Sequence, residues 1–343
     1  MPIGIFILVS VIKSAIILFV LLTAVAYTVW LERKVVGHMQ NRWGPTRVGP
    51  FGLLQPAADG LKFLFKEDLT PPHAYKPLFL AAPMMAVIFA LTSIAVIPFG
   101  NSITLFGYDI PLQITDVNIG LLLILGVTSM GVYGVALAGW SSNNKYSLLG
   151  GLRASAQMVS YEIALGLSLV GVLIQSGSFS LRAIVDAQGG RFLGFIPRWN
   201  IFHGQFIGFF IYLMAAYAET NRIPFDLPEA ETELVAGYHT EYSSMKFAMF
   251  FMAEYANMIT VACLATLLFF GGWHGPLFGP PLMQALLPVF WFAAKVFCFL
   301  FLYIWVRGTL PRFRYDQLMD FGWKFLLPLA IANLVATAIA VAW

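Results

Sequence analysis

Charged and metal-binding residues are scarce in this chain. Lys, Arg, Asp and Glu make up 11% of its 343 residues, against about 25% in soluble domains. The two cysteines, Cys263 and Cys298, each stand alone in an apolar stretch, and the five histidines are scattered. Iron–sulfur and zinc sites need several spaced thiolates or a Cys/His cluster. The sequence has no GxGxxG or Walker A motif either. We therefore expect no metal site, redox centre or nucleotide site in this chain.

Long apolar runs dominate what is present. The chain is 59% hydrophobic, with a mean hydropathy of +0.79. Runs of 18 or more mostly apolar residues can cross about 30 Å of hydrocarbon. The first run is too long for the apolar core of a signal peptide, so we expect it to be retained. The sequence predicts an all-α, polytopic bundle of about eight transmembrane helices in one integral membrane domain, residues 1–343. The predicted spans are roughly 4–30, 78–98, 117–139, 156–175, 205–219, 246–271, 284–306 and 322–342.

Basic residues are unevenly divided between the two sides of this predicted bundle. With an even number of spans the odd-numbered loops share one side, and they hold fifteen of the twenty Lys and Arg residues. The even-numbered loops hold only Arg182, Arg191 and Arg198, and Lys13 and Lys295 lie within spans. The positive-inside rule places the odd-numbered loops in the cytoplasm or matrix. The net charge of +3 thus reflects membrane topology and gives no reason to expect a nucleic-acid partner.

Acidic residues gather in one cytoplasmic segment, 219–246, and in the helices beside it. Seven of the seventeen Asp and Glu residues fall here. A carboxylate within a membrane segment costs roughly 2.5–3.5 kcal/mol on insertion scales, so such groups usually mark ion or proton paths. The alternative is that these acids belong to an ordinary solvated loop. Because the acidic segment is continuous with the apolar helices that carry Glu219 and Glu254, an ion or proton path is favoured. We expect Pro224 to interrupt any helix in this segment and Pro228 to stand at the start of a short helix. The seven residues are Glu219, Asp226, Glu229, Glu231, Glu233, Glu241 and Glu254.

A loop and an amphipathic helix are predicted between Glu32 and Lys76. Four glycines and two prolines between 37 and 52 indicate an ordered, turn-rich loop. Residues 53–66 then place apolar and polar side chains on opposite faces, a pattern typical of a helix in the membrane interface. This helix is either an ordinary juxtamembrane helix or a lateral doorway for a lipid-soluble ligand. The polar face carries Gln55, Asp59, Lys62 and Lys66.

Two glutamates are expected inside the membrane near its cytoplasmic edge. Glu162 lies nine residues after Arg153, roughly 13 Å along a helix, and Glu254 lies roughly 12 Å beyond Lys246. Their similar depth predicts a wet polar cavity between neighbouring helices. The alternative is that each glutamate only hydrogen-bonds an adjacent helix.

Four motifs make the chain closely similar to one family of membrane subunits. They read ERKVVGHMQNRWGP from 32, LRASAQMVSYE from 152, AETNRIPFDLPEAETELVAGYHTEY from 218 and WVRGTLPRFRYD from 305. The family that they resemble is the H subunit of bacterial respiratory complex I, the NADH–quinone oxidoreductase. Its mitochondrial equivalent is NADH dehydrogenase subunit 1. Residues 176–204 carry no motif that we can match.

The resemblance implies a site and a set of partners. Flavin (FMN) and iron–sulfur clusters would belong to other subunits, and quinone would be the substrate that this chain binds without a cofactor of its own. The quinone tunnel or cavity would be bordered by Glu32, Arg33, Arg42, Asp59, Arg222, Asp226 and Glu229. The proton-coupling carboxylates would be Glu162, Glu219, Glu231, Glu233, Glu241 and Glu254.

The implied partners are subunits of the hydrophilic arm at the quinone site and neighbouring small and antiporter-like membrane subunits, together with membrane lipid. A bacterial plasma (inner) membrane is favoured over the mitochondrial inner membrane. Two rival interpretations stay open at this point. One is a free-standing proton-coupled transporter, although the sequence shows no internal repeat of the kind common in such proteins. The other is the membrane anchor of a related energy-converting hydrogenase.

Overall fold

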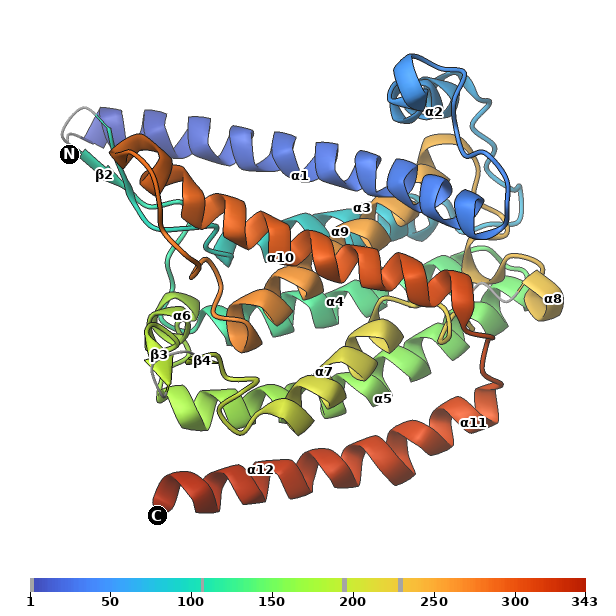
Figure 1. The fold of residues 1–343 in the computed structure, drawn as a ribbon. Coiled ribbons are helices and arrows are strands. Elements are labelled where there is room, and N and C mark those ends of the chain that lie inside the picture. The colour runs from blue at the N-terminus through green and yellow to red at the C-terminus, as the bar shows by residue number, and fades with distance from the viewer. Residues whose placement is uncertain (1–2, 106–107, 193–195, 228–230) are drawn as a thin grey trace.

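The computed structural model describes residues 3–105, 108–192, 196–227 and 231–343, and most of these residues are helical (Figure 1). The longer helices are α1 (Ile3–Met39), α3 (Lys76–Ser93), α4 (Gly120–Ser141), α5 (Lys145–Ser176), α7 (Phe206–Glu219), α9 (Ser244–Phe269), α10 (Pro281–Thr309) and α12 (Leu327–Ala342). The shorter ones are α2 (Gln55–Phe65), α6 (Leu181–Ala187), α8 (Glu231–Leu234) and α11 (Tyr315–Asp320), and a π-helical turn (Phe321–Leu326) joins α11 to α12. Two small hairpins pair β1 (Ile103–Leu105) with β2 (Tyr108–Ile110) and β3 (Arg191–Phe192) with β4 (Ile196–Pro197).

The prediction of an all-α polytopic membrane protein is confirmed. Within the described ranges, seven helical segments are long and apolar enough to cross a membrane. Helix α7, with 14 residues, is a shorter apolar helix at the fifth predicted span. Both chain ends lie at one end of the bundle, whereas α2, α8 and α11 lie at the other (Figure 1). We call the end with α2, α8 and α11 the basic end, because its loops carry most of the Lys and Arg residues.

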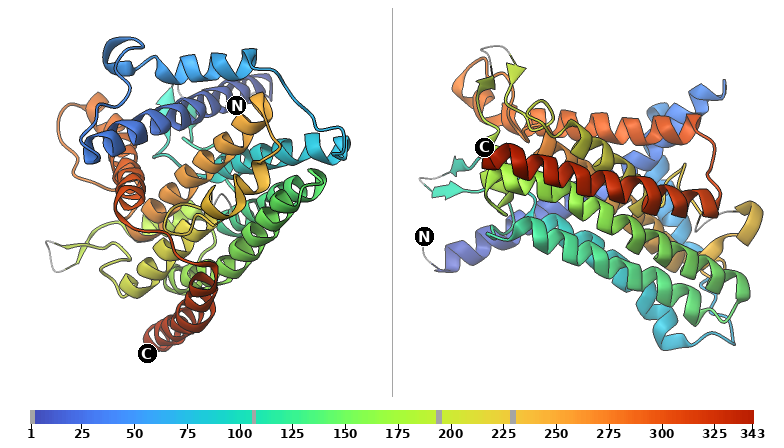
Figure 2. Two further views of the ribbon diagram at one scale, coloured as in Figure 1. Left: turned by 90° about the vertical axis from the view of Figure 1, so that its right-hand side faces the viewer. Right: turned by 90° about the horizontal axis from the view of Figure 1, so that it is seen from below.

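Helix α5 lies at the centre of one half of the bundle. It packs against α4, α7 and α12, while α9 packs against α3 and α10, as the views from the side and from below show (Figure 2). Fully buried apolar side chains such as Leu169 of α5, Tyr212 of α7 and Phe269 of α9 form the shared core. Helix α1 lies along the outside, and most of its apolar N-terminal half is exposed.

Two helices begin or end elsewhere than the sequence predicted. Helix α1 continues through Glu32 and Arg33 to Met39, although a loop was expected from Glu32. The reason is local, since Gly37 is the first glycine after Gly4 and no proline follows until Pro45. Helix α5 begins at Lys145, eleven residues before the predicted span, because the Asn144 side chain caps it by accepting a hydrogen bond from the Tyr146 N–H at 2.9 Å. Both helices therefore project beyond the predicted spans at the basic end.

The turn after α7 is held by one buried amide. The Gln157 side chain on α5 donates hydrogen bonds to the carbonyl oxygens of Ala218 at 2.8 Å and Phe225 at 2.7 Å. Residues 220–227 are not helical, as Pro224 led us to expect. This arrangement fixes Arg222 inside the protein. The predicted helix start at Pro228 and the position of Glu229 lie outside the described residues, and α8 is described from Glu231.

Close backbone contact between α5 and the 237–239 turn gives a first testable prediction. A Cβ at Gly150 would lie 2.7 Å from the Gly237 Cα and the Tyr238 N. We expect Gly150→Ala to destabilise the chain by about 1–3 kcal/mol, the usual cost of overpacking, and to lower the temperature of thermal inactivation. Gly166→Ala on the same helix is the matched control, because its Cβ would meet no atom within 4 Å. Equal inactivation temperatures for the two variants would contradict the prediction.

Candidate functional site: a buried charge cluster at the basic end

Arg222 is the centre of a buried group of charges. Its side chain, 6% exposed, forms ion pairs with Glu254 of α9 (Nε to Oε1, 2.7 Å) and with Glu32 of α1 (Nη1 to Oε2, 3.3 Å). The guanidinium also lies over the ring of Tyr255, 4.2 Å from its centroid, at cation–π distance. The turn after α7 thus joins α1 and α9 through a single arginine.

Glu32 has further partners, so both of its oxygens are used. Arg307 near the end of α10 forms an ion pair with Oε1, and the Tyr255 hydroxyl donates to Oε2 at 2.9 Å. We call Glu32, Arg222, Glu254, Tyr255 and Arg307 the charge cluster. Its two acids and two arginines balance in formal charge. Buried ions are tolerated when they are paired and hydrogen-bonded in this way.

A second buried ion pair lies beside the charge cluster. Asp226 is 7% exposed and accepts from Arg312 Nη2 at 2.9 Å. Arg312 belongs to the segment that connects α10 to α11. The Phe313 N–H, next along the chain, donates to the carbonyl of Pro224 at 3.1 Å, so the two segments are joined by main chain as well as by charge.

A cavity of about 380 Å³, lined mainly by charged and polar residues, adjoins the charge cluster, and we call it the polar cavity. Its lining comes from the C-terminal part of α1, the loop after it, the turn after α7 and the end of α10: Glu32, Arg33, Val36, Gln40, Arg42, Ile223, Arg307 and Gly308. Three predicted tunnel residues, Glu32, Arg33 and Arg42, therefore line one cavity. Asp59 of α2 joins them indirectly, because it forms an ion pair with Arg33 at 2.6 Å.

Glu162 and Glu219 form a separate group between α4, α5 and α7. The Ser129 hydroxyl of α4 donates to Glu162, and Glu219 interacts with Thr128 and is close enough to be repelled by Glu162. The sequence had predicted that Glu162 would share a cavity with Glu254. Instead, Glu162 lies with Glu219, and Glu254 belongs to the charge cluster.

Two tyrosines lie between these two groups. Tyr217 and Tyr303 are buried and stacked, with ring centroids 4.0 Å apart. Tyr303 is close enough to interact electrostatically with both Glu219 and Arg222. No pattern in the sequence predicted a role for Tyr217, Tyr303 or Tyr255. Arg307 and Arg312 stood in a quoted motif, but without a role.

The remaining predicted coupling carboxylates belong to the segment between α7 and α9 at the basic end. Glu233 pairs with Arg153 at 2.7 Å, and both side chains are substantially exposed. Glu241 accepts from the Asn144 side chain at 2.6 Å. Glu231 is the first residue of α8. In the part of the chain that the structure describes, no group of three or more His, Cys, Asp or Glu side chains is placed to hold a metal ion.

The fold and the site define a class: an integral membrane protein of many helices, with balanced buried charges where its helices meet a polar cavity. Comparison with known proteins gives the family. The sequence profile of the NADH dehydrogenase family matches residues 12–338. The chain belongs to this family and, within it, to the H subunits of NADH–quinone oxidoreductase. The resemblance noted in the sequence is thereby confirmed.

The similarity to curated relatives extends over nearly the full chain. The NADH-quinone oxidoreductase H 2 subunit of Koribacter versatilis is 72% identical, with 99% of both chains covered. The H 1 subunits of the same enzyme in Solibacter usitatus and Geobacter sulfurreducens are 53% and 54% identical. The comparison with the Solibacter subunit covers 98% of this chain and 98% of the relative. The comparison with the Geobacter subunit covers 94% of this chain and 92% of the relative.

Proposed function

We propose that this chain forms much of the tunnel by which quinone reaches its reduction site in NADH–quinone oxidoreductase. We further propose that it couples quinone reduction to proton translocation through its carboxylates. The observation that carries the proposal is the polar cavity beside the charge cluster. A quinone needs an apolar approach and a few convergent polar groups for its head. Arg33, Arg42 and Arg307 supply hydrogen-bond donors there for the carbonyl oxygens of the quinone head.

The approach for the apolar tail is proposed along α2. Leu61, Leu64 and Phe65 of this helix are exposed, as expected for side chains that face acyl chains. Asp59 on the same helix accepts from Gln55 at 3.1 Å and pairs with Arg33, which lines the polar cavity. Helix α2 thus carries both an exposed apolar surface and an ion pair to a residue that lines the polar cavity.

Coupling is proposed to begin at the charge cluster. Reduction of quinone takes up protons, or leaves a negative charge if uptake is delayed. A negative charge beside Glu32 and Arg307 would weaken the pairs that hold Arg222 between Glu32 and Glu254. Tyr303 lies between Arg222 and Glu219, so a shift of Arg222 would change the field at Glu219 and Glu162. In this way charge movement would reach the helices that face neighbouring membrane subunits.

The proposal assigns the electron carriers to other subunits. FMN and iron–sulfur clusters would lie in the hydrophilic arm, docked on the basic end. Small and antiporter-like membrane subunits would cover the α4–α5 side, with the basic end on the cytoplasmic face of a bacterial plasma membrane. Names of the relatives favour this assignment over a free-standing transporter or a hydrogenase anchor.

Isolation of the intact assembly tests the proposed partners and the proposed quinone site. The chain would be purified from its native membrane in mild detergent, and the proteins that accompany it would be identified. We expect flavin and iron–sulfur subunits, and inhibition of quinone reduction by quinone analogues. A chain that purifies without flavin and iron–sulfur subunits would contradict the proposed partners, and quinone reduction that quinone analogues do not inhibit would contradict the proposed tunnel.

The role of α2 gives a second testable prediction. Asp59→Ala removes the partner of Arg33, so we expect the KM for short-chain quinones to rise several-fold and inhibitor sensitivity to change, with normal assembly. Asp316→Ala is the matched control, because Asp316 also pairs with an arginine, Arg314, but that pair is exposed and outside the polar cavity. An unchanged KM in a fully assembled Asp59→Ala complex would exclude the doorway role.

A further inference from the structure

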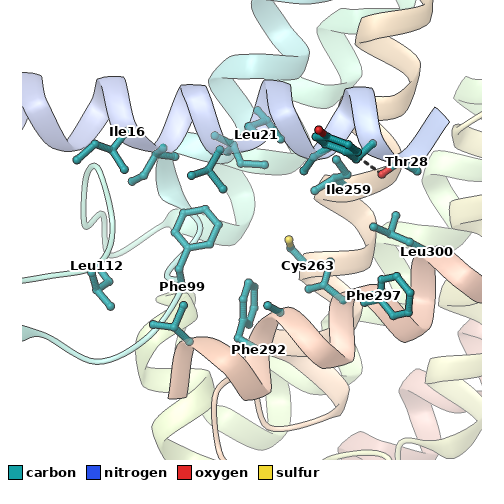
Figure 3. Close-up of a pocket in the computed structure, with 18 of the residues that line it drawn as sticks. Ile16, Leu21, Thr28, Phe99, Leu112, Ile259, Cys263, Phe292, Phe297 and Leu300 are labelled. Atoms are coloured by element: carbon teal, nitrogen blue, oxygen red, sulfur yellow. Dashed lines mark hydrogen bonds between the residues drawn. The ribbon is translucent and has the colours of Figure 1, made fainter. Parts of the chain in front are cut away.

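A large apolar cavity lies between α1 and α10, apart from the polar one. It has a volume of about 830 Å³, within the range of small-molecule sites. Side chains of α1 from Val9 to Leu31 and of α10 from Val289 to Leu300 line it, with Phe99 and Cys263 among the others. Figure 3 draws part of this lining, with Ile16 and Leu21 of α1 facing Phe292 and Leu300 of α10 across the space between the two helices. Helix α2 does not contribute to this lining.

The cavity opens sideways to the membrane. Val20 on α1 and Phe297 on α10 both line it, yet they are 58% and 52% exposed. Because they would face hydrocarbon in a bilayer, a lipid chain can enter without crossing a polar barrier. Water is disfavoured, since an apolar cavity of this kind offers it few hydrogen-bond partners.

The cavity follows α1 through most of the membrane. From Val9 to Leu31 it extends for roughly 33 Å, about the hydrocarbon thickness of a bilayer. The acyl chain of one lipid would occupy the part of this length nearest its headgroup.

Lys13 is the charged residue of this lining. It lies 19 residues before Glu32, roughly 28 Å along α1, and thus near the opposite face of the membrane. Tilt of α1 shortens this depth, and a lysine side chain can extend toward the interface. Its Nζ donates to the Pro111 carbonyl at 3.5 Å, the limit for a hydrogen bond. Within the described ranges its other N–H groups have no partner, so it can bind an anion.

We infer that this cavity is a phospholipid site, in which Lys13 binds the headgroup phosphate and α1 and α10 enclose an acyl chain. The phosphate lies at the end of the cavity away from the charge cluster, so the lipid belongs to the opposite leaflet. The apolar lining selects hydrocarbon over water. The apolar lining adds little affinity for the lipid, because the acyl chains of lipids in a bilayer are already in an apolar medium. The contact between Lys13 and the phosphate therefore decides retention.

Photolabelling of the intact complex tests this inference. The complex would be placed in phosphatidylcholine vesicles containing a trace of phosphatidylglycerol with a diazirine in its acyl chain, and labelled residues mapped by mass spectrometry. We expect labels at Ile16, Val20 and Phe297. Lys13→Ala should reduce them about five-fold, the effect of about 1 kcal/mol for one lysine at an anionic surface, and Lys13→Arg should retain them.

Cavity-filling variants provide the matched control. Ala293→Phe places a ring in the cavity and should also reduce labelling, whereas Cys298→Phe places the same ring on an exposed position of α10 outside the lining. Equal labelling in the wild type, Lys13→Ala and Ala293→Phe would show bulk lipid only and overturn the inference. Displacement of the label by long-tailed quinone, but not by unlabelled phosphatidylglycerol, would also overturn it, because the cavity would then hold a quinone tail. If the Lys13→Ala complex fails to assemble, labelling of Ala293→Phe and competition with unlabelled phosphatidylglycerol or long-tailed quinone still test whether the cavity binds phospholipid.

Discussion

Arg222→Ala is expected to lower NADH–quinone reductase activity on the order of ten-fold or more. The substitution leaves Glu32 and Glu254 buried without the arginine that joins them, and removing one partner of a buried pair typically costs about 3–5 kcal/mol. The two carboxylates would then take up protons or move apart, and the polar cavity would lose its shape. Arg222→Lys should retain part of the activity, because lysine keeps the charge but lacks the planar fork that reaches two acids at once.

Arg153→Ala is the matched control for this prediction. Arg153 also pairs with a glutamate at the basic end, but both partners are substantially exposed. Exposed pairs are worth about 0–1 kcal/mol, so activity should stay near that of the wild type. Oxidation of NADH with an artificial acceptor at the flavin end, measured in washed membranes, should survive in all three variants, which shows that the flavin subunits are still attached to the membrane part. Near wild-type quinone turnover in Arg222→Ala would refute the role assigned to the charge cluster.

The second large effect is expected from two carboxylates on the proposed coupling path. Glu254→Gln and Glu219→Gln keep the size of the side chain and most of its hydrogen bonding but cannot ionise. The first removes an ion pair of Arg222, and the second removes the charge close to Glu162 and Tyr303. We expect quinone reduction and proton pumping to fall together by roughly ten-fold, measured in vesicles with a pH-sensitive dye.

A surface acid distinguishes coupling from general charge loss. Glu233→Gln removes a charge from the same acidic segment at an exposed position, and such changes usually stay within about 0.5 kcal/mol. It should pump normally. If Glu254→Gln and Glu219→Gln assemble and pump as well as Glu233→Gln does, the carboxylate path is wrong and a scaffold role is left.

Hydropathy alone was sufficient to predict the class of fold. The apolar runs predict helices because a membrane segment must satisfy its main-chain hydrogen bonds internally. The ends of the helices were less predictable. Helix α1 continues to Met39 and α5 begins at Lys145, because the polar residues there are also good helix formers. Hydropathy reports where lipid ends, and a helix can continue beyond that point.

Three residues of the charge cluster, Glu32, Arg222 and Glu254, had been singled out in the sequence, but their partners could not be predicted. Arg222 was expected to hold neighbouring carboxylates, and the nearest in sequence is Asp226. Its ion pairs in the structure include Glu32, which lies 190 residues away, while Asp226 pairs with Arg312. Spacing along the chain reveals contacts within one helix or turn. Contacts among α1, α9, α10 and the turn after α7 depend on how the helices pack, which no local pattern contains.

The position of Glu162 has a consequence for biogenesis. Glu162 is only half-buried, and exposed apolar side chains such as Met130, Tyr133 and Val159 lie on the same two helices, α4 and α5. Inserted alone, the chain would present this carboxylate to lipid, at roughly 2.5–3.5 kcal/mol on insertion scales. A neighbouring helix that covers it removes the penalty, so the chain gains stability only as its neighbours join. We therefore expect newly made chains that find no neighbour to be short-lived in the membrane, which would keep the amount of this subunit matched to that of its partners.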